Sequence, residues 1–164
     1  MCTSGHHQEE AAPETFKHLL ERVRALVEGP HERDEKLRTI CILLAANVLH
    51  YHWVGFYLVG RPEKKELVLG PFAGAPTEHV RIPFGRGICG QAAERRGTLM
   101  AQDVSLESNY LACSPQVKAE IVIPILRNGA LLGLLDIDSQ FKAPFSVEDQ
   151  AFLERVCELL TVLF

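Results

Sequence analysis

The sequence predicts an α+β fold in which helices at both ends of the chain enclose a central antiparallel sheet. Apolar residues recur at helical spacing over residues 15–28, 34–50 and 147–163. Ser146 and Asp149 have the spacing of a reciprocal cap at the start of the last helix. In the middle of the chain the apolar period changes to two, which is typical of strands. These strand segments follow one another closely enough to pair as hairpins.

Two hairpins make up most of the predicted sheet. The first joins residues 52–59 to 66–72 around a charged turn, and the second joins 121–126 to 130–137. The second turn is Asn128-Gly129, a pair strongly favoured in two-residue hairpin loops. Between the hairpins the pattern adds two short elements, a helix over 87–96 and a strand over 98–102.

The strand over 130–137 is apolar on both faces, so helices or a long loop must cover each side of the sheet. Successive strand residues point in opposite directions, which divides them into two sets. One face carries Leu132, Leu134, Asp136 and Asp138, and the other carries Leu131, Gly133, Leu135 and Ile137. We therefore expect both aspartates to lie beneath a covering segment rather than in open water.

The first strand carries two aromatic residues on one face, Trp53 and Tyr57, with Gly55 between them. This alternation predicts a gap between two rings, where a small ligand with a sulfur or methyl group would pack well. Aromatic residues on a sheet are more often core residues, and we favour a ligand site here because acidic residues accompany them.

Length and charge narrow the class of protein. The 164 residues fit one domain, with residues 1–12 expected as a disordered tail and 13–164 as the folded unit. The net charge is −4 and the Lys and Arg residues are scattered, which argues against nucleic-acid binding. No stretch reaches the ~20 apolar residues of a membrane span, and the polar residues 1–10 do not form a secretory signal. We therefore expect a cytoplasmic location.

The five cysteines indicate redox chemistry rather than a disulfide framework, because a disulfide in a reducing compartment is transient or catalytic. Their odd number and irregular spacing also match no zinc template. Cys41 and Cys157 lie in apolar helical runs and are expected in the core. Cys89 lies in a glycine-rich turn, and Cys113 lies in a long irregular stretch over 103–118. A loop of this length is usually a lid or a binding loop, so it can bring Cys113 to a ligand on the sheet.

Three carboxylates accompany these two thiols, with Glu120 opening one strand and Asp136 and Asp138 closing the next. Clustered buried acids repel one another, so at least one pKa rises and a carboxyl stays protonated. At the start of a short helix, Cys89 gains thiolate character from the helix dipole, although the carboxylates oppose it. A thiolate beside a protonated acid is what sulfoxide reduction requires, because the oxygen must be protonated as sulfur attacks sulfur.

The run Gly85-Arg-Gly-Ile-Cys-Gly90 matches the G-x-G-x-x-G pattern of dinucleotide sites. The segment before it, 80–84, is short and contains Pro83, which is unfavourable in a central parallel strand. We therefore interpret these glycines as a tight turn of the chain rather than as a nucleotide site.

Six stretches of the sequence resemble the free methionine-R-sulfoxide reductases, which are stand-alone GAF domains. The stretches are Trp53-Val-Gly-Phe-Tyr57-Leu, Leu67-Val-Leu-Gly-Pro-Phe, Arg81-Ile-Pro-Phe-Gly-Arg-Gly-Ile-Cys89-Gly, Ala112-Cys113, Glu120-Ile-Val-Ile-Pro124 and Leu134-Leu-Asp136-Ile-Asp138-Ser139. They occur in order and cover most of the domain. The resemblance implies a GAF fold, with helices packed on one side of the antiparallel sheet and a loop-covered ligand pocket on the other.

The resemblance also implies the reaction, in which Cys113 attacks free methionine sulfoxide and becomes a sulfenic acid as methionine leaves. Glu120 and Asp138 would act in catalysis beside Cys113. The implied substrate-binding residues are Trp53, Tyr57, Glu120, Asp136 and Asp138. The acids would hold the substrate ammonium and polarise or protonate the sulfoxide oxygen. No bound cofactor or metal is implied, and thioredoxin is the implied reductant.

One position departs from the family pattern. His79 stands where the family commonly has a third cysteine, which is often the favoured resolving partner. Cys89 is then the remaining matched thiol, so we expect a Cys89–Cys113 disulfide that thioredoxin reduces. We interpret His79 as an ordinary loop histidine, with a role in Cys113 ionisation left open.

Two other functions are alternatives to the enzyme: a GAF module that senses a small ligand without chemistry, and a thiol redox switch. The chain lacks the asparagine-lysine-phenylalanine signature of cyclic-nucleotide-binding relatives, and a redox switch has no need for the acid cluster and the aromatic pair. We therefore rank the enzyme first. The two N-terminal helices are apolar enough to pair in a homodimer, and they are equally consistent with packing on the sheet of a monomer.

Overall fold

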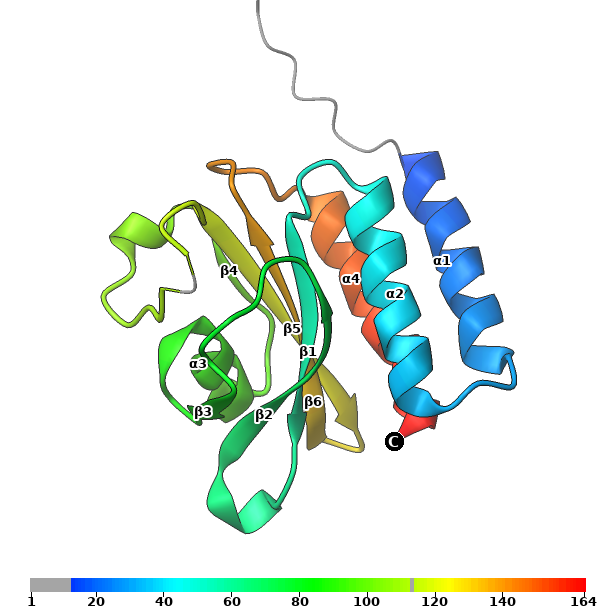
Figure 1. Ribbon diagram of the computed structural model, residues 1–164, viewed down its shortest axis with the longest axis horizontal. Coiled ribbons are helices and arrows are strands. Elements are labelled where there is room, and N and C mark those ends of the chain that lie inside the picture. The colour runs from blue at the N-terminus through cyan, green and yellow to red at the C-terminus, as the bar shows by residue number, and fades with distance from the viewer. Residues whose placement is uncertain (1–12, 113) are drawn as a thin grey trace, which may run out of the picture.

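The structure is a computed structural model that describes residues 13–112 and 114–164 of the chain. The tail predicted over residues 1–12 and the predicted nucleophile, Cys113, lie outside the described residues. A six-stranded sheet runs through the middle of the molecule, with helices on both sides of it (Figure 1). Over the described ranges, no helix is long and apolar enough to cross a membrane.

All neighbouring strands of the sheet are antiparallel, and both predicted hairpins are present. The strands are β1 (Trp53–Val59), β2 (Glu66–Ala73), β3 (Arg81–Pro83), β4 (Leu99–Ala101), β5 (Ala119–Arg127) and β6 (Ala130–Ser139). Their order across the sheet is β3-β2-β1-β6-β5-β4. Because β6 also pairs with β1, the two hairpins form one continuous sheet, which confirms the predicted α+β architecture.

Three helices cover one face of the sheet: α1 (Pro13–Glu28), α2 (Arg33–Asn47) and α4 (Val147–Leu160). Helix α2 packs on β1 and β2, α4 packs on β5, and α1 lies outside them in contact with both (Figure 1). The short helix α3 (Gly87–Arg95) covers the opposite face, against β5 and β6. Helix α2 ends at Asn47 rather than near residue 50, because the backbone of Val48 is extended.

The face beneath α1, α2 and α4 forms the larger apolar core. Cys41 and Cys157 lie in this core with exposed fractions of 0% and 3%, which confirms that both are packing residues. Their thiols donate to the backbone carbonyl oxygens of Pro71 and Ile123, and burial raises the pKa of each thiol. Neither cysteine faces the other side of the sheet, where the candidate site lies.

A bulge in β6 corrects the predicted division of its side chains between the two faces. Ile125 of β5 lies opposite Gly133, and the next residue, Leu126, lies opposite Leu131, so Leu132 is an extra residue in β6. As a result Leu132 packs with the helix-covered core and Leu131 with the opposite face. The prediction was wrong for these two leucines. It holds after the bulge, where Asp136 and Asp138 share the face that α3 covers.

The glycine-rich turn follows an edge strand, not a central parallel one, because β3 is at the end of the sheet and pairs antiparallel with β2. Gly85 (φ +88°) and Gly87 (φ +66°) adopt left-handed backbone conformations. A Cβ on Gly90 would lie 2.5 Å from the carbonyl oxygen of Pro83. These glycines therefore make a tight turn, as predicted, and the turn directs α3 so that Cys89 faces the sheet.

The start of α4 is held by a buried polar network around Asp149. One carboxylate oxygen of Asp149 accepts from the hydroxyl and backbone N–H of Ser146, so the predicted reciprocal cap is confirmed. The other oxygen accepts from the Tyr51 hydroxyl at 2.6 Å and contacts His50 Nε2 at 2.7 Å. All three of Asp149, His50 and Tyr51 are buried. The network therefore fastens α4 to the segment between α2 and β1.

Replacing Asp149 by alanine is expected to lower the free energy of unfolding at pH 7 by about 3 kcal/mol, because it leaves buried donors unpaired. Burial alone would raise the pKa of Asp149, but the hydrogen bonds from His50, Tyr51 and Ser146 outweigh it and lower the pKa below its ordinary value. The contribution of Asp149 is therefore present at neutral pH and is lost as the pH falls below about 4. Urea unfolding at pH 7 and at pH 3 measures both effects.

The exposed neighbour Glu148 supplies the control for this prediction. Glu148→Ala removes a carboxylate from the same turn of α4 and should change the unfolding free energy by less than about 0.5 kcal/mol. An Asp149→Ala deficit no larger than that of the control, or one of equal size at both pH values, would contradict the role of the network.

Candidate active site

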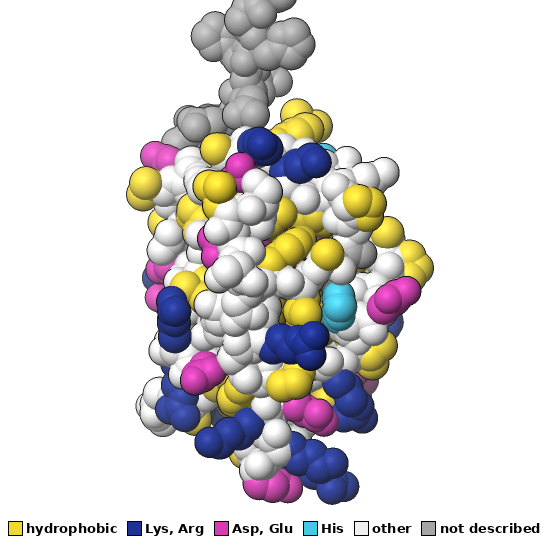
Figure 2. Space-filling model, turned by 90° about the vertical axis from the view of Figure 1, so that its left-hand side faces the viewer, with side chains coloured by type: hydrophobic (Ala, Val, Ile, Leu, Met, Phe, Trp, Pro, Cys, Tyr) yellow, Lys and Arg dark blue, Asp and Glu magenta, His cyan; other side chains and the backbone are white. Residues whose placement is uncertain are grey.

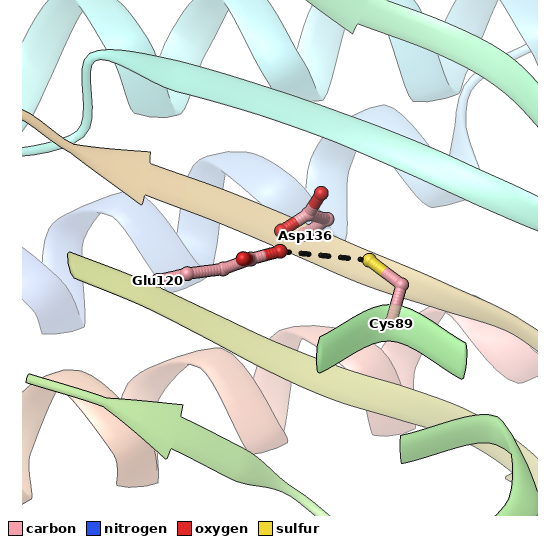
Figure 3. A group of neighbouring side chains, drawn as sticks. All are labelled: Cys89, Glu120 and Asp136. Atoms are coloured by element: carbon pink, nitrogen blue, oxygen red, sulfur yellow. Dashed lines mark hydrogen bonds between the residues drawn. The ribbon is translucent and has the colours of Figure 1, made fainter. Parts of the chain in front are cut away.

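A thiol and three carboxylates meet on the face of the sheet that α3 covers. Glu120 of β5 lies directly opposite Asp138 of β6, and Asp136 lies two residues before Asp138 on the same face. All three acids are buried, with exposed fractions of 6%, 3% and 2% in that order. Cys89 reaches them from the first turn of α3, and its Sγ lies 3.7 Å from Oε1 of Glu120 (Figure 3). The structure thus brings together four of the five polar residues that the sequence singled out.

Burial keeps protons on this cluster at pH values where exposed acids have lost theirs. It raises the pKa of Asp136 to about 6, against the opposing effect of hydrogen bonds with Glu120 and Cys89. Burial raises the pKa of Asp138 well above its ordinary value, and the charge of Asp136 adds to this effect. The predicted protonated carboxyl is therefore consistent with the geometry.

The pKa of the Cys89 thiol is shifted in the opposite direction from the one predicted for a thiol at the start of a helix. Its pKa is raised well above the ordinary value, first by burial and then by the charges of Asp136, Glu120 and Asp138. These effects outweigh any stabilisation of a thiolate by the short helix α3. Cys89 is therefore a neutral thiol in the reduced protein, and the thiolate character expected from the helix dipole was wrong.

The rings of Trp53 and Tyr57 form one wall of the site, and there is no empty space between them. The indole ring of Trp53 extends over Gly55, where a Cβ would lie only 2.3 Å from the ring. The same ring stacks on Phe72 with centroids 5.5 Å apart, and its Nε1 donates to the carbonyl oxygen of Ala75 at 2.9 Å. The predicted gap between Trp53 and Tyr57 is therefore wrong, because glycine at position 55 makes room for the indole itself. The two rings still share one wall, with centroids 6.4 Å apart.

A cavity of about 300 Å³ opens above Asp138 and the edge of Trp53. Its walls come from the start of β1, the end of β6 and three loops, which follow β2, precede β5 and follow β6. The residues that line it are His52, Trp53, Ala75, Pro76, Thr77, Ser114, Pro115, Gln116, Val117, Asp138, Ser139 and Gln140. Figure 2 views the molecule from the side of α3 and its neighbouring loops, and shows apolar side chains gathered in the middle of this face. Most of the Lys and Arg side chains in that view lie toward the end of the molecule that carries the β1–β2 turn.

Cys113 lies outside the described residues, but both of its neighbours are placed. Ser114 lines the cavity, and the carbonyl oxygen of Ala112 lies 3.0 Å from Nε2 of His79. The loop before β3 is therefore tied to the cysteine-bearing loop by His79, whose own carbonyl oxygen accepts from the hydroxyl of Tyr57 at 2.9 Å. The sequence treated His79 as an ordinary loop histidine, because nothing in the pattern indicates a contact between residues 33 positions apart.

His52 lines the cavity, and sequence reasoning did not select it. Its Nδ1 accepts the backbone N–H of Gln140 at 2.9 Å, so the neutral ring carries its proton on Nε2. Burial and the nearby His50 lower the pKa of His52, which favours the neutral ring. His52 therefore supplies an uncharged N–H group to the rim of the cavity.

Comparison with known proteins places this arrangement in a family. The GAF domain model matches residues 32–163. The chain is 35% identical over 153 residues to the free methionine-R-sulfoxide reductase of Saccharomyces cerevisiae, with 87% of this chain and 83% of that protein covered. It is 36% identical to the Escherichia coli free methionine-R-sulfoxide reductase, with 92% and 89% covered. A solved structure of the Neisseria meningitidis enzyme in complex with its substrate superimposes with a TM-score of 0.86 at 34% identity, covering 94% of this chain and 92% of that one.

The chain therefore belongs to the GAF-domain family. Within this family it belongs to the group that contains the free methionine-R-sulfoxide reductases. The resemblance drawn from the sequence motifs is therefore confirmed, and so is the GAF fold.

Proposed function

We propose that this protein reduces free L-methionine-R-sulfoxide to methionine. The observation that carries the proposal is the buried cluster of Cys89, Glu120, Asp136 and Asp138, of which Asp138 lines the cavity. Within the described part of the chain, Oδ1 of Asp136 is a buried oxygen with no hydrogen-bond partner. A buried acceptor of this kind calls for a proton donor from a ligand. The relatives named as reductases of this substrate supply the chemical class of that ligand.

A free amino acid matches the cavity in charge as well as in size. Its ammonium group would pair with the acids, and a protonated carboxyl among Asp136, Asp138 and Glu120 would donate to the sulfoxide oxygen. Its methyl and sulfur would pack on the wall formed by Trp53 and Tyr57. A methionine sulfoxide inside a peptide has no free ammonium, so this arrangement favours the free amino acid.

The reaction then proceeds at sulfur. The thiolate of Cys113 attacks the sulfoxide sulfur, the oxygen is protonated and passes to Cys113, and methionine leaves a sulfenic acid on the protein. A second thiol, that of Cys89, attacks the sulfenic acid and releases water, which forms a Cys89–Cys113 disulfide. Reduced thioredoxin returns both cysteines to thiols in the cytoplasm. A disulfide requires the two Cα atoms to lie within about 7 Å of each other. The loop that carries Cys113 contacts the start of α3 through Asn109, whose side-chain oxygen accepts from the backbone N–H of Gly87 at 2.8 Å.

Replacing Cys89 by serine is expected to leave one turnover intact and to lower thioredoxin-linked turnover at least about a hundred-fold, because no thiol remains to resolve the sulfenic acid. Rapid quench followed by chromatography measures the single turnover, and thioredoxin-coupled NADPH oxidation measures cycling. Cys157→Ser is the matched control, since Cys157 is a buried thiol on the other side of the sheet.

A thiol at position 79 should restore cycling in the Cys89→Ser variant. The ring of His79 contacts the peptide that immediately precedes Cys113, so a cysteine there would be close to the sulfenic acid. We expect His79→Cys combined with Cys89→Ser to recover thioredoxin-linked turnover, whereas His79→Ser in the same background should not. Unchanged cycling in Cys89→Ser alone would exclude Cys89 as the resolving residue.

A further inference from the structure

The buried cluster has the composition and geometry of a site for a thiophilic divalent metal ion. The sulfur of Cys89 and one carboxylate oxygen each from Glu120 and Asp136 all lie within 4.8 Å of one another. Figure 3 shows the three side chains converging from α3, β5 and β6. The Sγ to Oε1 distance between Cys89 and Glu120 is 3.7 Å. A tetrahedral zinc ion, with Zn–S of about 2.3 Å and Zn–O of about 2.1 Å, places a sulfur about 3.6 Å from an oxygen.

Two further observations concern the partners of Asp136 and the charges near the cluster. Asp136 is only 2% exposed, and its Oδ1 has no hydrogen-bond partner among the described residues. None of the described residues that line the cavity beside Asp138 is Lys or Arg. Buried carboxylates are normally paired with a cation or hydrogen-bonded at each oxygen. A metal ion would supply the missing partner for Asp136.

We infer that Zn²⁺ binds to Cys89, Glu120 and Asp136 in the reduced protein, with a water molecule as the fourth ligand. On binding, the S–H proton of Cys89 passes to solvent as the sulfur–metal bond forms. The thiolate ligand selects Zn²⁺ and Cd²⁺ over Mg²⁺ and Ca²⁺, which prefer oxygen ligands only. No redox change accompanies binding, and a chelator removes the ion.

Occupation of this site would switch the enzyme off, a consequence that rests on the proposed function. The metal uses the acids that would hold the substrate ammonium and the thiol that would resolve the sulfenic acid. Zn²⁺ is therefore expected to inhibit reversibly and in competition with methionine sulfoxide. The binding itself does not depend on the reaction and is measured separately.

The test uses the full-length chain with Cys2→Ser, His6→Ala and His7→Ala, because these N-terminal residues are themselves potential metal ligands. Titration with Cd²⁺ should produce the ultraviolet absorption band that marks a cadmium–thiolate bond, and the band should reach its full intensity at one equivalent of Cd²⁺. Titration with Zn²⁺ should raise the melting temperature in a concentration-dependent way, and Mg²⁺ should not. Cys89→Ser should abolish the cadmium band, and Asp136→Asn should weaken Zn²⁺ binding at least about a hundred-fold.

Two matched controls test whether Cys89 is the thiol that binds the metal ion. Cys41→Ser removes a buried thiol from the opposite core and Cys113→Ser removes the proposed nucleophile, and the cadmium band should survive both. Melting curves without metal establish that each variant is folded. A missing cadmium band, a band that survives Cys89→Ser, or a band lost in Cys113→Ser would overturn the site. Metal binding in a protein that reduces no sulfoxide would instead contradict the proposed function and leave the metal site standing.

Discussion

Replacing Cys113 by serine is expected to lower kcat/KM for free L-methionine-R-sulfoxide at least about a thousand-fold. A serine hydroxyl is not ionised at neutral pH and cannot become a sulfenic acid, so the variant lacks both the nucleophile and the oxygen acceptor. The neighbouring residues support this role, since Ser114 and Pro115 line the cavity and Asp138 lies at its foot. The assay is formation of methionine with dithiothreitol as reductant, which removes any dependence on the resolving thiol.

Binding should survive this substitution, which separates chemistry from recognition. Trp53 is the only tryptophan of the chain and it lines the cavity, so its fluorescence reports ligand binding directly. We expect the Cys113→Ser variant to bind methionine sulfoxide within about threefold of the native affinity. Cys41→Ser, a substitution in the helix-covered core, should retain activity. Residual activity above about a tenth of the native value in Cys113→Ser would contradict the assignment of the nucleophile.

Replacing Asp136 by asparagine is expected to stabilise the protein above pH 7 while lowering its activity at least about a hundred-fold. Burial raises the pKa of Asp136 to about 6, so the unfolded chain releases its proton at a lower pH than the folded protein. The unfolding free energy therefore falls as the pH rises from about 4 through about 6, by roughly 3 kcal/mol for a shift of about two pKa units. Asparagine does not ionise, so the variant avoids this loss.

The pH dependence distinguishes this effect from a general change in packing. The advantage of Asp136→Asn should be absent near pH 4 and complete above pH 7, and denaturant unfolding at both values measures it. Asp103→Asn is the control, because the pKa of Asp103 is shifted in the opposite direction from that of Asp136. Hydrogen bonds from Ser105 lower the pKa of Asp103, so its replacement should give no gain at any pH. An Asp136→Asn variant that is less stable than the native protein at pH 8, or fully active, would contradict the account of the acid cluster.

Most of the architecture could be predicted from the sequence, because apolar periodicity and turn residues are local signals. The Asn128-Gly129 turn identified the β5–β6 hairpin, and the alternation after it placed Asp136 and Asp138 on one face. The bulge at Leu132 was missed, since an extra residue in a run of leucines leaves the apolar pattern unchanged. The residues that meet across the sheet were singled out from their places in strands and turns, and the family resemblance supplied their expected roles.

The features that the sequence did not predict depend on contacts between distant segments. The buried network joins Asp149 to His50 across 99 positions, and the tie between His79 and Ala112 crosses 33. The neutral state of Cys89 depends on burial, which a helix-start argument does not include. In the same way, Gly55 was interpreted as an empty place beside Trp53, although the size of an indole ring leaves no space there.

The most direct test of the central claim uses an equal mixture of the two sulfoxide epimers of free L-methionine. The protein is incubated with the mixture and dithiothreitol, and chromatography separates methionine from each remaining epimer. The account predicts that the R epimer is consumed completely, that the S epimer remains, and that methionine reaches half of the starting sulfoxide. Consumption of both epimers, or of neither, would contradict it.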